Sequence, residues 1–257
     1  MTDTVTPMFP EGRRELILRT LRREGPAAVR ALAERLGVSE ATIRRDLVQL
    51  DKEGRLSRVH GGAVAAEDTD DPFAEVAAQR VAEKDAIAVR CAELVKDGEA
   101  VLLDIGTTAH RVARALRGRS LTVITSNLMV YEELKDDGDI QIVLLGGIVR
   151  RSYHSLVGFL TEDNLRQVHA DRLFLSTSGV RPGGHVMDTT AVEVPLKRAM
   201  IAAADQVVLI ADASKFPGTG IAKVCGPEDI DMLVTNAPAD AATRTALREA
   251  DVEVVEV

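Results

Sequence analysis

The stretch Val38-Ser39-Glu40-Ala41-Thr42-Ile43-Arg44-Arg45-Asp46-Leu47 decides the fold of the first quarter of the chain. Ser39 is a favoured N-cap residue, so the stretch predicts a turn followed by a helix. Apolar residues recur at helical spacing and predict a buried face: Ile43, Leu47 and Leu50. Arg45 falls on the opposite face, with Arg44 beside it. A short helix that is buried on one side and carries arginine on the other suits the major groove of DNA.

Two further helices and a hairpin are predicted around this stretch. Residues 13–24 form a helix that places Leu16, Ile17 and Leu21 inward and its arginines outward, and Gly25-Pro26 ends it. A second helix covers about 28–36, and the opening helix continues to about Glu53. The alternating residues 55–64 predict a β-hairpin, because Gly61-Gly62 suits a turn that needs positive φ. Three helices and a basic hairpin predict a winged helix-turn-helix.

The first 64 residues resemble the DNA-binding domain of the DeoR family of bacterial transcriptional repressors. The resemblance rests on a specific combination of residues: Arg13-Arg14, Leu32-Ala33, Val38-Ser39, Thr42-Ile43-Arg44-Arg45-Asp46-Leu47, Gly54 and Arg58-Val59-His60-Gly61-Gly62-Ala63. It implies operator DNA as a partner. We expect Arg45 to contact a base, while Arg44, Ser39, Thr42 and Arg58 fix the head on the backbone. His60 is either structural or a phosphate donor.

The distribution of charge agrees with this assignment. The chain of 257 residues has a net charge of −8, but residues 1–64 hold 12 Lys and Arg against 9 Asp and Glu, and the remainder holds 20 against 31. A mildly basic head on an acidic body fits a protein whose head alone binds DNA. Such a head makes few contacts, so we expect a homo-oligomer, at least a dimer (dimer or tetramer), on paired half-sites.

The rest of the chain predicts a second, larger domain. Residues 65–75 predict a linker, since 65–72 are small, acidic and end in proline, and a long helix is expected over 73–96. From Ala100 on, apolar runs alternate with helical segments, which indicates a mainly parallel, Rossmann-like α/β sheet covered on both faces. The runs are 100–104, 121–124, 140–145, 172–175, 206–210, 232–234 and 252–255. We therefore divide the chain into a head (1–64), a linker (65–75) and an effector domain (76–257).

Polar or glycine residues follow several of these strands, where ligands bind in parallel sheets. In Asp104-Ile105-Gly106-Thr107-Thr108, glycine and two hydroxyls stand at the start of a helix, which suits an anion, although an ordinary N-cap turn has the same pattern. Thr125-Ser126-Asn127, Gly146-Gly147 and Ala211-Asp212-Ala213-Ser214-Lys215-Phe216 occupy the corresponding places after later strands. Each motif is weak alone, and their repetition predicts a ligand site.

The segment from about Glu83 to Asn236 resembles the effector-binding domain of the same family, which is similar in fold to ribose-5-phosphate isomerase. The matching residues are as follows: Asp104, Gly106-Thr107-Thr108, Thr125, Asn127, Gly146-Gly147, Gly158, Gly179, Glu193, Lys197, Asp212 and Ser214-Lys215-Phe216. The resemblance implies a phosphorylated sugar or related metabolite as effector. Its phosphate would lie against the Gly106-Thr107-Thr108 turn with Lys215 as counter-charge, and Asp104 and Asp212 would lie near the sugar hydroxyls. The family often has Thr-Asn-Ser after the second strand, whereas this chain has Thr125-Ser126-Asn127.

Glu193 and Lys197 allow two interpretations. At a spacing of four they can form an ion pair on a helix surface, worth about 0.3–0.5 kcal/mol. Pro195 between them belongs in the first turn of a helix, which places Glu193 near the helix start, where both could bind a sugar.

Other classes of site and protein are disfavoured. The five histidines lack metal-binding spacing, the two cysteines are far apart, and neither a membrane-spanning run nor a signal peptide is found. We therefore expect a cytoplasmic protein without metal or cofactor. Two alternatives remain open: a sugar-phosphate isomerase with a DNA-binding head, using Asp104, Glu193 or Asp212 as base, and a transcriptional activator.

Overall fold

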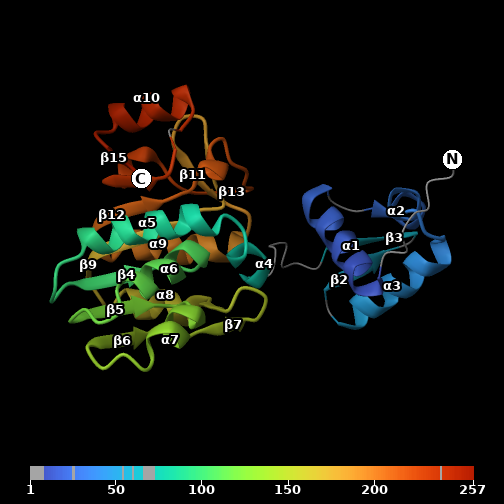
Figure 1. The fold of residues 1–257 in the computed structure, drawn as a ribbon, viewed down its shortest axis with the longest axis horizontal. Coiled ribbons are helices and arrows are strands. Elements are labelled where there is room, and N and C mark those ends of the chain that lie inside the picture. Colours follow the sequence, from blue (N-terminus) through green and yellow to red (C-terminus); the bar gives the residue numbers. More distant parts are fainter. Residues whose placement is uncertain (1–8, 25–26, 54, 60, 66–72, 238) are drawn as a thin grey trace. The chain divides into compact units, whose positions relative to one another are not determined.

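Three helices and a small antiparallel sheet form the N-terminal unit. The computed structural model describes residues 9–24, 27–53, 55–59, 61–65, 73–237 and 239–257, and the chain divides into two units, Met1–Asp71 and Pro72–Val257 (Figure 1). The helices of the first unit are α1 (Pro10–Glu24), α2 (Val29–Leu36) and α3 (Glu40–Lys52). Strands β2 (Leu56–Val59) and β3 (Gly62–Ala65) form the hairpin, and β1 (Ala27–Ala28) adds to it in the order β1-β3-β2. The predicted winged helix-turn-helix is confirmed.

The two glycines of the hairpin have different roles. Gly61 takes the positive φ of the turn, at 79°. Gly62 lies against β1, and a Cβ there would be 2.3 Å from the carbonyl oxygen of Ala27. The first glycine therefore permits the turn and the second permits the third strand, which the sequence pattern did not predict.

The core of this unit corrects one expectation about α1. Ile17 and Leu21 are buried as expected, together with Leu18, while Leu16 is only half-buried. Arg13 was expected to face solvent, but its side chain is 11% exposed and is paired with Asp46 of α3. Helical spacing alone did not reveal this, because the partner lies 33 residues away.

A seven-stranded parallel sheet forms the centre of the second unit. Its order is β15-β14-β12-β9-β4-β5-β6, with every neighbouring pair parallel. The strands are β4 (Ala100–Leu103), β5 (Leu121–Thr125), β6 (Ile140–Leu144), β9 (Ala170–Ser176), β12 (Ala204–Ile210), β14 (Met232–Thr235) and β15 (Glu253–Glu256). All seven coincide with the predicted apolar runs, and the α/β class is confirmed.

Helices cover both faces of this sheet (Figure 1). One apolar core joins it to α5 (Val81–Leu94), α6 (Thr107–Ala115) and α7 (Leu128–Leu134), and the other to α8 (Phe159–Leu165), α9 (Val194–Ala202) and α10 (Ala241–Glu249). Successive residues of β4 enter opposite cores, Val101 one and Leu102 the other. This explains why the strands are continuous apolar runs.

The prediction of one long helix over 73–96 is wrong, because this segment forms two helices. A short α4 (Phe73–Ala77) precedes α5, and Arg80 between them has a left-handed φ of 51°. Five short strands outside the main sheet were also not predicted, since three or four residues give too little alternation to recognise. They are β7 (Ile148–Arg150), β8 (Ser155–Val157), β10 (Gly179–Arg181), β11 (His185–Asp188) and β13 (Ala222–Cys225). No helix of the described residues is both long and apolar enough to cross a membrane.

Candidate functional site

The first candidate site is the exposed face of α3. Ser39 caps this helix: its Oγ accepts a hydrogen bond from the Thr42 backbone N–H at 3.2 Å, and the two hydroxyls are 2.9 Å apart. The cap leaves Ser39 exposed beside the first turn. A side-chain hydrogen bond therefore defines the start of α3.

The two neighbouring arginines of α3 have different surroundings. Arg44 donates to Glu40 Oε2 at 2.7 Å across one helical turn. Arg45 is exposed, and within the part of the chain that the structure describes no ion pair engages its guanidinium. Arg45 can therefore donate to a base edge without first losing a partner.

A buried ion pair fixes α3 against α1. Arg13 donates to Asp46 through Nε at 2.6 Å and Nη2 at 3.3 Å, and the Asp46 side chain is 8% exposed. Asp46 directly follows Arg45, so this pair determines how the exposed face of the helix is presented. The sequence marked Asp46 only as part of a motif.

The hairpin contributes one exposed cation to the same unit. Arg58 of β2 is exposed, and its backbone N–H donates to Asp51 at 3.4 Å. Arg55 instead pairs with Glu15 of α1 at 2.8 Å. His60, a predicted contact, lies outside the described residues.

The second candidate site lies where the strand order of the large sheet reverses. The chain proceeds outward from β4 to β5 and β6, then returns to β9 on the other side of β4. Ligands of open parallel sheets bind at the carboxyl ends of the strands at such a point. Asp104 directly follows β4, and Ser176 is the last residue of β9.

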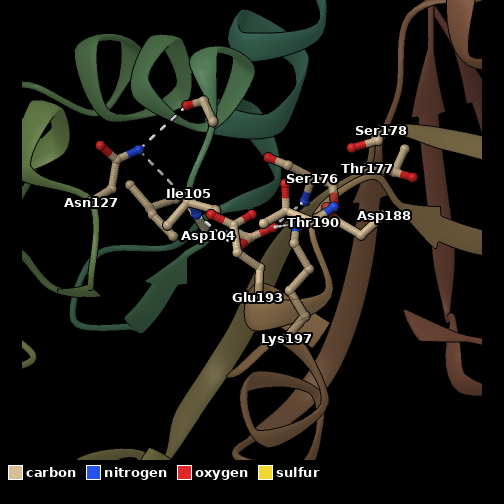
Figure 2. A network of polar contacts seen from close by, with 12 residues as sticks. Asp104, Ile105, Asn127, Ser176, Thr177, Ser178, Asp188, Thr190, Glu193 and Lys197 are labelled. Atoms are coloured by element: carbon tan, nitrogen blue, oxygen red, sulfur yellow. Dashed lines mark hydrogen bonds and ion pairs between the residues drawn. The ribbon is translucent and has the colours of Figure 1, made fainter. Parts of the chain in front are cut away.

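A network of buried charges occupies this point (Figure 2). Lys197 Nζ of α9 lies 2.6 Å from Asp104 Oδ2 and 3.4 Å from Asp188 Oδ2, and donates to the Ser176 carbonyl at 2.9 Å. Asp104 also accepts from the backbone N–H groups of Ser176 and Ile105. Burial lowers the pKa of Lys197, but the nearby carboxylates outweigh it and raise the pKa well above its ordinary value.

Glu193 belongs to this network through another partner. It pairs with Arg150 at the end of β7, whose Nη2 also lies 3.4 Å from Thr190 Oγ1. Glu193 and Lys197 are each 2% exposed, so the interpretation as a surface ion pair is wrong. The three acids and two cations of this network, Asp104, Asp188, Glu193, Arg150 and Lys197, come from four separate segments.

Asn127 holds the turn after β4 in place. Its Oδ1 caps α7 by accepting from the Met129 N–H at 2.9 Å, and its Nδ2 donates to the carbonyls of Asp104 and Gly106, both at 3.4 Å (Figure 2). All of its polar groups are thus engaged within the protein. Asn127 therefore positions the backbone of the turn from Asp104 to Gly106.

The start of α6 has no side-chain cap, as is also the case for α2, α5, α8 and α9. Ser39, Asn127 and Asp240 cap their helices with a side chain, whereas Gly106 before α6 supplies no side-chain cap. Gly106 has a φ of 119°, and a Cβ there would lie 3.2 Å from Ser176 Oγ. The turn therefore presents backbone N–H groups of Thr107 and its neighbours, which suits an anion.

A cluster of cations lies around Lys84 of α5 and includes Arg111 of α6. Asp212 caps the short helix Ala213–Lys215 after β12, and Arg80 Nε is 3.7 Å from its carboxylate. Lys84 of α5 is 4% exposed, and its pKa is lowered to about 8. Burial is the main cause; Asp212 opposes it, and the charges of Lys215, Arg111 and Arg80 add to it. We name Arg80, Lys84, Arg111 and Lys215 the cation cluster. Of these, sequence reasoning identified only Lys215, because charges at helical spacing on α5 and α6 are typical of any solvated face.

The glycine pair after β6 has a packing role. A Cβ on Gly147 would lie 2.1 Å from Thr161 Oγ1 and 2.9 Å from the Val157 carbonyl oxygen, and the Gly146 N–H donates to Asn164 Oδ1. Gly146 and Gly147 thus allow the segment to approach α8 and β8. No contact in the described residues brings them to the Asp104 network.

Comparisons with known proteins agree for both units. A family model described as the DeoR-like helix-turn-helix domain matches residues 13–69, and one described as the DeoR C terminal sensor domain matches residues 79–237. An uncharacterized HTH-type transcriptional regulator of Bacillus subtilis, YulB, is 34% identical over 97% of this chain and 98% of its own. The glycerol-3-phosphate regulon repressor of Escherichia coli is 33% identical over 86% of this chain and 89% of its own. Ribose 5-phosphate isomerase A from Methanocaldococcus jannaschii superposes with a TM-score of 0.38 at 18% identity, over 51% and 52% of the two chains.

Proposed function

Because this chain belongs to the DeoR family of transcriptional regulators, we propose that it represses a sugar-metabolism operon in the cytoplasm and that a phosphorylated sugar relieves the repression. The family resemblance predicted from the sequence is thereby confirmed. The observation that carries the proposal is the exposed Arg45, without an ion pair among the described residues, on a helix whose other side is buried. Reporter expression with and without the gene distinguishes repression from activation.

Arg45→Ala is expected to weaken operator binding by about 1–3 kcal/mol and to relax specificity at one base pair. Fluorescence anisotropy measures the affinity for DNA from upstream of the regulated operon and for its single-base variants. Arg44→Ala is the matched control, because Arg44 already pairs with Glu40 and is expected to lose less. An equal loss across all variants for Arg45→Ala would show that Arg45 contacts only phosphate.

The cation cluster supports an anionic effector. Arg80, Arg111 and Lys215 surround the buried Lys84 closely enough to lower its pKa, against the carboxylate of Asp212. Arg111 also pairs with Asp85 at 2.5 Å, and Arg80 lies 3.6 Å from Glu83. The hydroxyl groups of such a ligand would lie near the carboxylate of Asp104, two residues before Gly106. A relative of this chain is the repressor of a glycerol-3-phosphate regulon, and we propose a ligand of the same chemistry, a phosphorylated polyol or sugar.

Lys215→Met is expected to weaken the binding of sugar phosphates by about 1.5–3 kcal/mol, the range for hydrogen bonds to charged groups. Calorimetry with glycerol 3-phosphate and a panel of sugar phosphates measures it. Lys223→Met, which removes an exposed lysine of β13, is the control. Equal affinities for both variants and the unchanged chain would exclude Lys215 as a phosphate ligand.

The site does not favour the alternative of an isomerase. A general base needs a carboxylate free to take a proton, but Asp104 is ion-paired with Lys197 and Glu193 with Arg150. Asp212 accepts a hydrogen bond from the Ser214 backbone N–H and lies 3.7 Å from Arg80. The relatives are transcriptional regulators. Absence of ribose 5-phosphate turnover is the expected result.

An exposed apolar surface supports a homo-oligomer. Ile148, Phe159 and Leu160 are 60%, 65% and 48% exposed, and Gly158 beside Phe159 lies against Ile148. Contiguous exposed apolar surface marks interaction sites, and we propose that a second copy of the chain covers it, since paired half-sites need two heads.

Phe159→Glu is expected to shift the chain toward monomer in sedimentation velocity, because a buried, unpaired carboxylate disfavours the interface. Ile221→Glu, at a 79% exposed residue elsewhere, serves as control. An unchanged sedimentation coefficient for Phe159→Glu would place the interface on another surface.

A further inference from the structure

The short helix α4 is held at its C-terminal end by two members of the cation cluster. Lys84 Nζ donates to the Val76 carbonyl at 2.6 Å, and Arg111 Nη2 donates to the Ala77 carbonyl at 3.1 Å. These carbonyls belong to the last turn of a helix, where backbone acceptors have no partner within the helix. The side chains that the proposed phosphate would need are thus also the partners of α4.

The N-terminal end of α4 is anchored by an aromatic residue. Phe73 is 4% exposed, and its ring packs edge-on against His110, Tyr153 and His154, with centroids 5.8–6.0 Å apart. Its backbone N–H donates to the Ser152 carbonyl at 3.1 Å. The second unit begins at Pro72, so α4 is its first helix along the chain after the DNA-binding unit.

This anchor is connected to the buried charge network. The Arg150 guanidinium lies 5.3 Å from the Tyr153 ring centroid, and the same arginine pairs with Glu193. Tyr153 in turn contacts Phe73. The C-terminal end of α4 therefore contacts cations of the proposed effector site, and its N-terminal end contacts the segment that follows Arg150.

We propose that the effector's phosphate competes with the carbonyls of α4 for Lys84 and Arg111, and that release of α4 is how binding reaches the DNA-binding unit. This inference rests on the proposed function. A phosphate offers charged oxygens, and its bonds to lysine and arginine are stronger than those of a neutral carbonyl. Burial of Lys84, which disfavours its charged form, adds to the gain from an anionic partner.

Competition between phosphate and the α4 carbonyls predicts an effect on ligand affinity, which a purely structural contact of Lys84 and Arg111 does not. If the phosphate loosens α4, then loosening α4 must strengthen phosphate binding by the same factor, typically about 5- to 150-fold. Phe73→Ala removes the anchor of α4 without touching the cation cluster. It should therefore bind the ligand more tightly than the unchanged chain.

The test uses the full chain, with glycerol 3-phosphate and inorganic phosphate as probes. Calorimetry compares the unchanged chain, Phe73→Ala and Phe73→Leu, with Val89→Ala on the exposed side of α5 as control. Hydrogen exchange follows the backbone N–H groups of Ala78 and Gln79, which donate to the carbonyls of Ala74 and Val76. Thermal unfolding checks that each variant is folded, and Phe73→Leu preserves apolar volume if Phe73→Ala does not fold.

The expected result is faster exchange at Ala78 and Gln79 on addition of either probe, and at least about 5-fold tighter probe binding by the folded Phe73 variant. Two results would overturn the proposed release of α4 without contradicting the effector site. One is slower exchange in the Gly106 turn with no change at Ala78 and Gln79. The other is equal probe affinity of the Phe73 variant and the unchanged chain. No probe binding by any chain would overturn the effector site itself and the competition with it.

Discussion

Lys197→Met is expected to lower the free energy of unfolding of the C-terminal unit by about 3–5 kcal/mol. Methionine retains the apolar stem of lysine, so the change removes chiefly the charge. Asp104 and Asp188 would then be buried without their shared cation, since their side chains are 0% and 3% exposed. Urea unfolding followed by circular dichroism measures the loss, and Lys223→Met, at an exposed position, is the control.

The pH dependence of this variant gives an independent check. In the unchanged chain the raised pKa of Lys197 keeps it charged well above neutral pH, so its contribution is fully present below its unfolded pKa and is lost only at high pH. Burial already raises the pKa of Asp104 in the unchanged chain, with Lys197 opposing the shift, so removal of Lys197 raises it further. The variant should therefore regain stability as pH falls and the carboxyl takes up a proton. Asp104→Asn combined with Lys197→Met should recover part of the loss at neutral pH. A single variant as stable as the unchanged chain would show that water reaches the network.

The sequence predicted the elements of the large sheet because its strands are continuous apolar runs. Val101, Leu102 and Leu103 are all fully buried, because helices cover both faces of the sheet. It also placed Asp104 and Gly106 correctly at a strand end. What it lacked were the partners: Lys197 lies 93 residues from Asp104, and Arg150 lies 43 residues from Glu193. Such pairs depend on strand order, and the order reverses between β4 and β9 without any local signal.

The same limitation applies to the side chains that hold α4. Lys84 and Arg111 lie on helices where charges at that spacing are ordinary, and the groups they contact are backbone carbonyls, which every residue has. The break between α4 and α5 is marked only by Arg80 in a left-handed conformation. A sequence pattern therefore predicts one long helix here, although the junction is the part of the unit nearest to the DNA-binding head along the chain.

Asp46→Ala is expected to destabilise the N-terminal unit by about 3–5 kcal/mol, because it leaves the Arg13 guanidinium buried without its carboxylate. Operator binding should be lost with it, although Asp46 itself faces α1. Glu34→Ala is the matched control: it also removes the carboxylate of an arginine pair, but that pair is 81% and 67% exposed and contributes at most about 1 kcal/mol. Hydrogen exchange on the full chain separates unfolding of α1 and α3 from the intact C-terminal unit.

A double replacement distinguishes loss of the pair from loss of the charge on α3. Arg13→Met with Asp46→Leu removes both charges and fills the space with apolar side chains, a change that is often neutral or stabilising for buried pairs. If the pair acts only by fixing α3 against α1, the double variant should fold and bind operator DNA, since Arg45 remains exposed on the same helix. If Asp46→Ala were instead to retain operator affinity and protection of α1, the position of α3 would depend on Ile43, Leu47 and Leu50 alone.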